Sequence, residues 1–234
     1  MIKKVLISSP TAAAKNYCAK DWIEHVRSLK YPNKELVLFD NTLDKGRNAA
    51  FLESTYGVKC DWAYTEEREL FKRMSISHDK CRQYAIDNNF EWWLHLESDV
   101  FPPEDVIERL LSHGKKVVGG IYHIKTGKER TALIQEILTL APNERQAIQM
   151  TNKDEVFYID GKLKQVYHIG LGCVLIHRSV FTKIQFRMLE GVDCAPDSFF
   201  AEDCNSMNIP IHVDTSIICE HRNMLWGSHG ITFK

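Results

Sequence analysis

The sequence predicts an α/β fold with a mostly parallel central sheet, and three observations lead to this prediction. Short runs rich in β-branched and apolar residues alternate with segments of helical periodicity through the first hundred residues. The run WWLHL at 92–96 is typical of a strand that is covered on both faces. The chain has 234 residues, 44% of them apolar, which is enough to bury a core. Strand–helix alternation of this kind implies parallel strands joined by right-handed crossovers.

The first half of the chain supplies these elements in turn. We expect strands over residues 4–8, 35–40, 61–65 and 92–96, and helices over 16–29, 47–56 and 76–88. In the first helix, Trp22, Ile23, Val26 and Leu29 fall on one face. This face is therefore expected to pack against the sheet.

The second half is less regular. Strands are expected over residues 116–122, 166–176 and 211–219, and helices over 178–184 and 199–205. The sequence Gly170-Leu171-Gly172 interrupts the middle strand, as in a β-bulge or a close approach of backbones. Residues 131–160 are polar, and Pro142 and Asn143 would break a long helix. No repeat or linker divides the chain, so one domain over 1–234 is predicted.

Composition and charge narrow the functional classes. Thirty basic residues balance thirty-one acidic ones, so no global field attracts a polyanion, and a nucleic-acid partner is not indicated. No stretch is long and apolar enough to span a membrane, and the apolar segment before Ser8 is too short for a signal peptide. Seven cysteines without CxxC spacing are interpreted as buried apolar residues. A cytoplasmic location is therefore expected.

Two carboxylates follow the apolar strand at 92–96, in the sequence Glu97-Ser98-Asp99. In open α/β sheets, binding sites lie at the carboxyl ends of the strands. On an extended backbone the two carboxylates would face the same side, about 7 Å apart. Like charges that close need a cation or a shared proton, and Mg²⁺ or Mn²⁺ suits oxygen ligands. The alternative is that Asp99 only caps a helix that starts near residue 102.

Further polar residues lie at predicted element ends, and each also has a plain structural interpretation. The Ser9-Pro10-Thr11 segment and Asp40 follow the first two strands, and Asp40 alone would suit an Asx turn. Arg82 could be a solvated helix charge. Glu202-Asp203 could be acids favoured at a helix start. His221 could be a hydrogen-bonded surface residue after the last strand.

In their order along the chain, these features resemble the GT-A glycosyltransferases, which use nucleotide sugars, and they are most similar to the family 2 type. The resemblance runs from Val5 to about Asn223. It implies a mostly parallel central sheet with flanking helices and a small antiparallel sheet on the acceptor side. Residues 1–100 would form the nucleotide-sugar-binding half, 101–223 the acceptor-binding and catalytic half, and 224–234 a tail, in which Trp226 could belong to a lid.

The resemblance also assigns roles to residues. Glu97 and Asp99 match the metal-binding aspartate-any-aspartate motif, with Glu in place of the first Asp, and His221 matches a histidine that completes the metal site in several GT-A enzymes. Mn²⁺ or Mg²⁺ would therefore be the cofactor. The residues implied at the donor are Pro10, Thr11, Asp40, Arg82 and Ser98.

The implied reaction moves a sugar from a UDP-, GDP- or dTDP-linked donor to an acceptor hydroxyl. A carboxylate must take the proton of that hydroxyl, and the resemblance places this general base at Asp203, beside Glu202, with inversion at the sugar. The acceptor stays open between a glycan, a protein and another hydroxyl compound. Residues 126–164 have no counterpart in the family and would be an insertion or an acceptor loop.

Two other functions stay open at this stage. A nucleotidyltransferase would also place carboxylates around Mg²⁺, but residues 8–12, SSPTA, lack the glycines of a phosphate-binding loop. A catalytically silent module that binds a nucleotide or carbohydrate is conceivable because Glu97 departs from the family motif. Turnover of a nucleotide sugar with Mn²⁺ separates an enzyme from such a binder.

Overall fold

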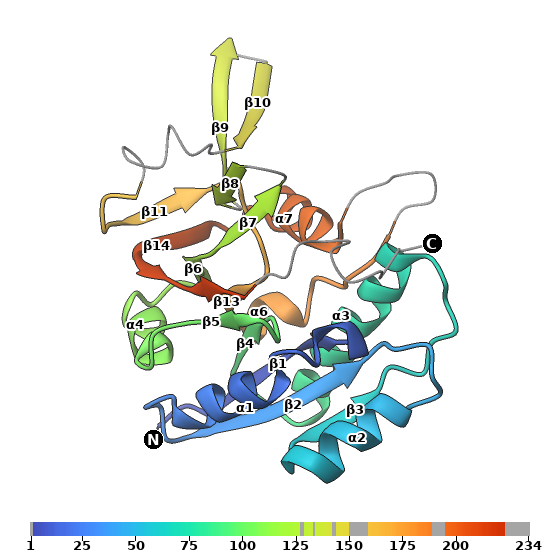
Figure 1. Ribbon diagram of the computed structural model, residues 1–234. Helices are drawn as coiled ribbons and strands as arrows, with labels where there is room; N and C mark the ends of the chain where they lie inside the picture. The colour runs from blue at the N-terminus through green and yellow to red at the C-terminus, as the bar shows by residue number, and fades with distance from the viewer. Residues whose placement is uncertain are drawn as a thin grey trace.

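The computed structural model describes residues 2–126, 129–132, 134–141, 144–149, 159–188 and 195–222 (Figure 1). An eight-stranded sheet lies at its centre, in the order β11-β14-β6-β13-β4-β1-β2-β3. Its strands are β1 (Val5–Thr11), β2 (Lys34–Asp40), β3 (Lys59–Trp62), β4 (Trp92–Leu96), β6 (Val117–Ile121), β11 (Leu163–Val166), β13 (Cys173–His177) and β14 (Ile211–Ile218).

The remaining elements are helices and short strands. The helices are the 3₁₀ turn η1 (Ala13–Lys15), α1 (Ala19–Ser28), α2 (Arg47–Tyr56), α3 (Leu70–Asp87), α4 (Val106–Ser112), α6 (Arg178–Phe181) and α7 (Pro196–Ser206). Small sheets pair β5 (Val100–Phe101) with β15 (Glu220–His221), β7 (His123–Thr126) with β8 (Glu129–Ala132), and β9 (Ile134–Ala141) with β10 (Glu144–Gln149) and β12 (His168–Ile169).

The central sheet confirms the predicted α/β class. Strands β4, β1, β2 and β3 pair in parallel, as do β6 and β14. Strand β13 lies antiparallel between β4 and β6, and β11 is antiparallel at the edge. The sheet is therefore mostly parallel with helices around it, and small antiparallel sheets are present as expected.

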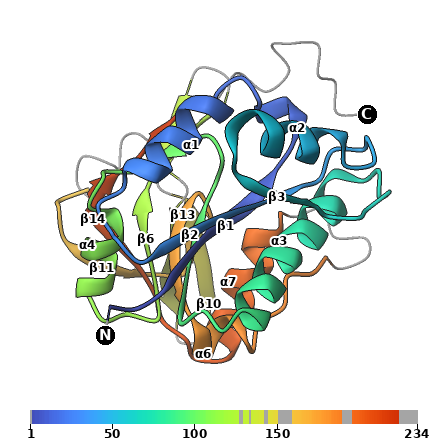
Figure 2. The same ribbon diagram turned by 90° about the horizontal axis from the view of Figure 1, so that it is seen from below.

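Helices cover both faces of the sheet, so the molecule has two apolar cores. Figure 2 shows α1 and α2 on the side opposite α3. Strand β4 contributes to both cores: Trp92, Leu94 and Leu96 pack on the α1 side, and Trp93 packs on the α3 side. All five residues of β4 are buried, which confirms the strand covered on both faces that the sequence predicted.

Helix α1 shows how the sequence pattern determines packing. Its buried positions include Trp22, Ile23 and Val26, the face predicted from helical periodicity. The Trp22 indole Nε1 also donates a hydrogen bond to the Val100 carbonyl oxygen over 3.0 Å. The helix begins at Ala19 rather than at residue 16, because the preceding residues form the 3₁₀ turn η1 and its continuation.

Two helices begin earlier than the sequence predicted. Helix α3 starts at Leu70 instead of residue 76, and Glu69 caps it by accepting a hydrogen bond from the Lys72 backbone N–H. Helix α7 starts at Pro196 instead of residue 199. Proline is favoured in the first turn of a helix because its missing N–H needs no partner there. The α7 start changes which acidic residues stand at the helix N-terminus.

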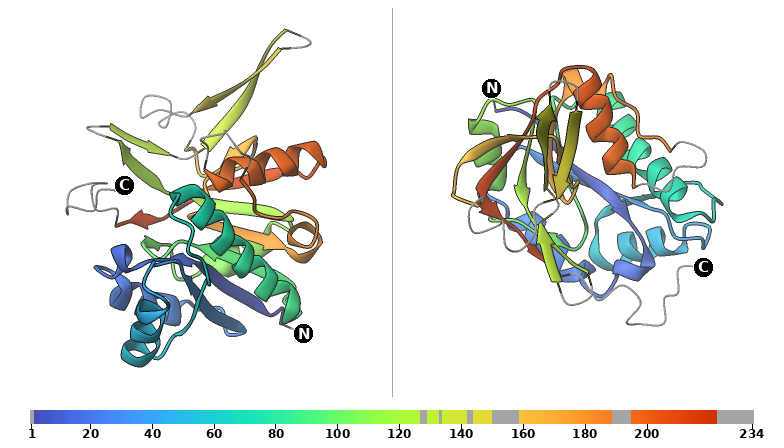
Figure 3. Two further views of the ribbon diagram at one scale, coloured as in Figure 1. Left: turned by 90° about the vertical axis from the view of Figure 1, so that its right-hand side faces the viewer. Right: turned by 90° about the horizontal axis from the view of Figure 1, so that it is seen from above.

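The single strand predicted over 166–176 is instead divided between two sheets. Strand β12 pairs with β9, and β13 joins the central sheet between β4 and β6. Residues 131–160, left unassigned from the sequence, contain the β9–β10 hairpin, which projects from the body of the molecule (Figure 3). Pro142, Asn143 and the tail from residue 223, with Trp226, lie outside the described residues.

Two further sequence predictions concern cysteines and membrane segments. Six cysteines are free and buried, as expected, and Cys194 lies outside the described residues. Among the helices that the structure describes, none combines the length and apolar character needed to cross a membrane.

Gly119 on β6 is expected to tolerate no side chain. A Cβ atom there would lie 2.5 Å from the Cys173 carbonyl oxygen and 2.8 Å from the Ile169 Cδ1. Because the first contact is backbone in the neighbouring strand, Gly119→Ala should lower the free energy of unfolding by about 1–3 kcal/mol. Chemical denaturation measures this loss, and an unchanged midpoint would show that β6 and β13 are not packed this closely.

Candidate metal and donor site

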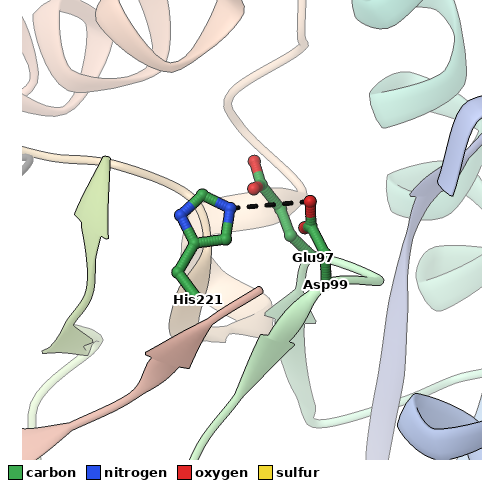
Figure 4. Close-up of side chains that lie close together, drawn as sticks. All are labelled: Glu97, Asp99 and His221. Carbon is green, nitrogen blue, oxygen red and sulfur yellow. Dashed lines mark ion pairs between the residues drawn. The ribbon is translucent and has the colours of Figure 1, made fainter. Parts of the chain in front are cut away.

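Three potential metal ligands converge at the carboxyl end of β4. Glu97 and Asp99 lie in the turn between β4 and β5, and His221 lies in β15. One ligand atom from each residue lies within 4.8 Å of the other two (Figure 4). Strand β15 brings the histidine there because it pairs with β5, with His221 opposite Val100. The Arg222 N–H also donates to the Asp99 carbonyl oxygen over 3.0 Å.

The backbone at the two carboxylates is a tight turn and not the extended segment predicted. The Val100 N–H donates to the Glu97 carbonyl oxygen over 3.0 Å, which closes the turn. The Glu97 N–H donates to the Gly172 carbonyl oxygen over 2.9 Å, which ties the turn to the segment before β13. The turn explains why two carboxylates, expected about 7 Å apart on an extended strand, instead share one small site.

His221 is held in a defined orientation. Its Nδ1–H donates to the His123 carbonyl oxygen over 2.8 Å, and its Nε2 lies 3.5 Å from Asp99 Oδ2. Metal-binding histidines commonly use one ring nitrogen in this way, which orients the other toward the ion. Burial lowers the pKa of His221, but the hydrogen bond and charge of Asp99 and the charge of Glu97 raise it overall.

Lys15 contacts both carboxylates and was not predicted from the sequence. Its Nζ lies 2.7 Å from Asp99 Oδ1 and 3.8 Å from Glu97 Oε2. Burial would raise the pKa of Asp99, but Lys15 and His221 lower it overall. For Glu97, burial and then the nearby Asp99 charge outweigh Lys15 and raise its pKa. Asp99 is therefore the more firmly ionised carboxylate of the two.

The cluster fits a divalent cation. Two carboxylate oxygens and one imidazole nitrogen suit Mn²⁺ and related ions, which favour oxygen ligands and accept imidazole. The side chains of Asp99 and His221 are each 7% exposed and that of Glu97 is 24% exposed. Because Glu97 is partly exposed, phosphate oxygens or water could complete the coordination of a cation held here.

Predicted donor residues line the neighbouring strand ends. The Thr11 and Ser98 hydroxyls lie 3.0 Å apart and join the ends of β1 and β4, next to Pro10. Asp40, at the end of β2, is fully buried, and its Oδ1 accepts from the Thr42 hydroxyl at 2.7 Å.

The two oxygens of the Asp40 carboxylate differ in their partners. The Asn48 amide donates to Oδ1 over 2.8 Å, whereas Oδ2 has no partner among the described residues. Burial is the largest influence on Asp40 and raises its pKa. The hydrogen bond from Thr42 to Asp40 stays within the Asp40-Asn41-Thr42 segment. It is therefore a local contact, like the turn that was the structural alternative for Asp40.

Arg82 does not take part in this cluster. Its guanidinium pairs with Asp79 within α3 at 2.5 Å and donates to the Phe181 carbonyl oxygen of α6 over 3.2 Å. The side chain is 11% exposed, so the interpretation of Arg82 as a solvated helix charge is wrong. Arg82 connects α3 to α6, and its role at the donor stays a prediction.

Glu202 and Asp203 also have partners away from the cluster. Asp203 Oδ1 lies 2.6 Å from Arg187 Nη2, and Glu202 accepts a hydrogen bond from the Tyr167 hydroxyl. Within the described part of the chain, no hydrogen bond or ion pair joins either acid to the metal-ligand cluster. Both residues lie in the second half of α7 and not at its start.

Asp197 is the acid at the start of α7, and the sequence prediction missed it. Its Oδ2 lies 3.7 Å from His168 Nε2. Burial and the Asp99 charge raise the pKa of Glu97, and the charge of Asp197 raises it further. Burial is also the largest cause of the raised pKa of Tyr122, to which the charge of Asp197 contributes. Pro196 was the signal that could have located it, since proline in the first turn marks a helix start.

Two buried histidines beneath the site predict acid sensitivity. The His78 and His95 rings stack with centroids 4.9 Å apart. Burial lowers the pKa of His78 to about 4 and that of His95 well below its usual range. Between pH 6.5 and 4, unfolded chains bind protons that the folded protein does not. Stability should therefore fall with decreasing pH by about 1.4 kcal/mol per unit for each histidine.

His78→Gln isolates the contribution of one histidine. We expect the free energy of unfolding to depend less steeply on pH in the variant than in the wild type between pH 6 and 4.5. Denaturant titrations at several pH values measure both slopes. Equal slopes would mean that His78 titrates alike in the folded and unfolded states.

Comparison with known proteins adds to this geometry. No protein-family model and no curated protein matches the sequence. Among solved structures, a mannosyltransferase, PcManGT from Pyrobaculum calidifontis in complex with GDP-Man and Mn²⁺, matches 98% of this chain with TM-score 0.63 and 14% identity. GalNAc-T7 with UDP, GalNAc and Mn²⁺ matches 100% with TM-score 0.60 and 10% identity. The chain has the GT-A glycosyltransferase fold.

The extent of these matches differs between the structures. The chain spans 60% of the mannosyltransferase and 46% of GalNAc-T7. A third structure, the protein A197 from STIV, matches 94% of this chain and is itself covered over 86% of its length, with TM-score 0.51 and 13% identity. At such identities the likeness establishes the fold alone, and the family 2 type stays a prediction.

Proposed function

We propose that this GT-A protein is a metal-dependent glycosyltransferase that moves a sugar from a nucleotide-sugar donor to an acceptor hydroxyl. The observation that carries the proposal is the convergence of Glu97, Asp99 and His221 at the carboxyl end of β4. Such edges are where open α/β sheets bind ligands. The two similar glycosyltransferase structures contain Mn²⁺ together with a nucleotide or nucleotide sugar, which supports the same class of ligand here.

In this proposal the cluster of Glu97, Asp99 and His221 holds Mn²⁺ or Mg²⁺. When bound, the ion neutralises charge on the leaving diphosphate as a Lewis acid. The nucleoside would lie along the ends of β1 and β2, near Pro10, Thr11 and Asp40, with Ser98 beside them. The Oδ2 of Asp40 is one of the buried acceptors in this region that lack a partner among the described residues.

We place the general base at Asp197 instead of Asp203. Asp203 lies six residues farther along α7, which corresponds to about 9 Å along the axis and a rotation of roughly 120° away. Its carboxylate is also engaged by Arg187. Asp197 is close enough for its charge to act on Glu97. It would take the acceptor proton as the hydroxyl attacks the sugar, with inversion.

The acceptor side is proposed to include the projecting β9–β10 hairpin and the segment around Gly172. The Tyr122 ring packs against Gly172 so closely that a Cβ there would lie 2.4 Å from the ring, and it meets the His221 ring edge-on at 5.4 Å. Tyr122 thus connects the metal-ligand cluster to this side. The acceptor would be a glycan, a protein or another hydroxyl compound.

A thermal-shift panel tests the proposed function. UDP-, GDP- and dTDP-sugars are each added with and without Mn²⁺, and the unfolding temperature is measured. Stabilisation by one nucleotide class only with metal is the expected result, because a ligand that binds the folded state raises its stability. Turnover then separates an enzyme from a silent binding module. Equal stabilisation with and without metal would contradict the proposed site.

A further inference from the structure

The Lys15 ammonium contacts the two carboxylates that a divalent cation would bind in the proposed site. The ammonium lies 2.7 Å from one proposed ligand, Asp99, and 3.8 Å from another, Glu97. The lysine side chain is 31% exposed, so it has a route to move away from the carboxylates. The burial of Asp99, which is 7% exposed, makes a positive partner there necessary in the free protein.

The turn that carries Lys15 is also joined to the proposed nucleoside side. The Ala13 N–H donates to the Thr42 hydroxyl over 2.8 Å, and that hydroxyl donates to Asp40 Oδ1 over 2.7 Å. On the other side, the Cys18 N–H donates to the Lys15 carbonyl oxygen over 3.3 Å at the start of α1. Two hydrogen bonds, both made by the Thr42 hydroxyl, therefore connect Asp40 to the turn that carries Lys15.

Binding a divalent cation and the Lys15 ammonium to the same carboxylates at once would be energetically unfavourable. Positive charges about 4 Å apart repel strongly at the edge of a protein. If a metal binds Asp99 and Glu97, the ammonium must find another anion. In the reaction proposed above, the donor diphosphate is the anion that arrives at the same edge of the sheet.

We propose that Lys15 is an exchangeable counterion of the metal site. In the free protein it neutralises Asp99 and Glu97 and weakens metal binding. When the metal and a nucleoside diphosphate bind together, the ammonium moves to the diphosphate, so that each ligand strengthens the binding of the other. This inference rests on the proposed function and adds to it a residue that makes metal and donor binding interdependent.

The test measures Mn²⁺ binding directly by electron paramagnetic resonance, alone and with UDP or GDP. Lys15→Met should bind Mn²⁺ alone about tenfold or more tightly than the wild type, because a competing charge is gone. In the variant, UDP or GDP should strengthen Mn²⁺ binding less than in the wild type. Lys20→Met is the matched control, since it removes an exposed lysine five residues away on α1 and should change neither quantity.

The outcomes separate this inference from the proposed function. Unchanged Mn²⁺ affinity in folded Lys15→Met would overturn the exchange, and Lys15→Gln serves as the second neutral variant if methionine disturbs folding. Lys15→Arg should retain wild-type behaviour, because it keeps the charge. If Lys15→Met binds Mn²⁺ more tightly but neither protein binds any nucleotide, the proposed function fails while the competition at the carboxylates stands. Undiminished reinforcement by UDP or GDP in the variant would overturn the transfer to the diphosphate.

Discussion

Replacing Asp197 with asparagine is expected to lower kcat for sugar transfer by about 10²- to 10⁴-fold, the usual contribution of a general base. Asparagine has nearly the same shape but cannot accept the acceptor proton. Donor binding should change little, because Asp197 is not among the proposed metal ligands. Steady-state kinetics, with donor affinity measured separately by calorimetry, distinguish the two effects.

Asp203→Asn is the matched control on the same helix. Its partner Arg187 is 40% exposed, and ion pairs of this kind contribute about 1 kcal/mol or less. Activity should therefore stay near that of the wild type. Lost activity in Asp203→Asn together with normal activity in Asp197→Asn would return the base to Asp203, the residue that the sequence resemblance indicated.

Asp99→Asn is expected to weaken Mn²⁺ binding by roughly 100-fold or more in the presence of the nucleoside diphosphate. Even residues that only support a metal ligand cost about 10- to 100-fold when they are replaced. The substitution also removes the charge that holds Lys15 and His221 in place. Titration of Mn²⁺ by electron paramagnetic resonance measures the loss.

Asp105→Asn controls for the loss of a carboxylate elsewhere. Asp105 is about half exposed and pairs with Arg109 at 3.7 Å, away from the cluster. It should leave Mn²⁺ binding unchanged. If Asp99→Asn also bound Mn²⁺ like the wild type, the ion would have to bind elsewhere, and the proposed metal site would be wrong.

Much of the fold follows from patterns that act over short distances. The uninterrupted apolar run of β4 predicted its bounds and its burial on both faces, and α2 has the bounds that periodicity predicted. The ends of other helices depend on capping. Helix α7 was predicted to begin after the proline that starts it, so Asp197 was not recognised as an acid of its first turn.

Long-range pairing could not be derived from local sequence. The short strands β5 and β15 have two residues each, yet their pairing delivers His221 to the carboxylates. The resemblance identified this histidine, while its geometry required the fold. Lys15 gave no signal, because a lysine after a strand is ordinarily solvated and only the tertiary structure shows that it contacts Asp99.

The same limit explains why the burial of Arg82 was not predicted. A charged residue in the middle of an amphipathic helix is usually solvated, and the resemblance placed it near the donor. The structure buries it because Asp79 and a carbonyl oxygen of α6 satisfy its guanidinium. Partners of this kind come from distant parts of the chain, which the sequence of α3 does not reveal.

The most direct measurement is an anomalous difference map from crystals grown with Mn²⁺ and the nucleoside diphosphate that stabilises the protein. We expect a peak bound by Asp99 and His221, with Glu97 beside it and the Lys15 ammonium on the diphosphate. A nucleotide bound with no manganese at these residues, and with Lys15 still on Asp99, would contradict the metal-dependent glycosyltransferase proposed here.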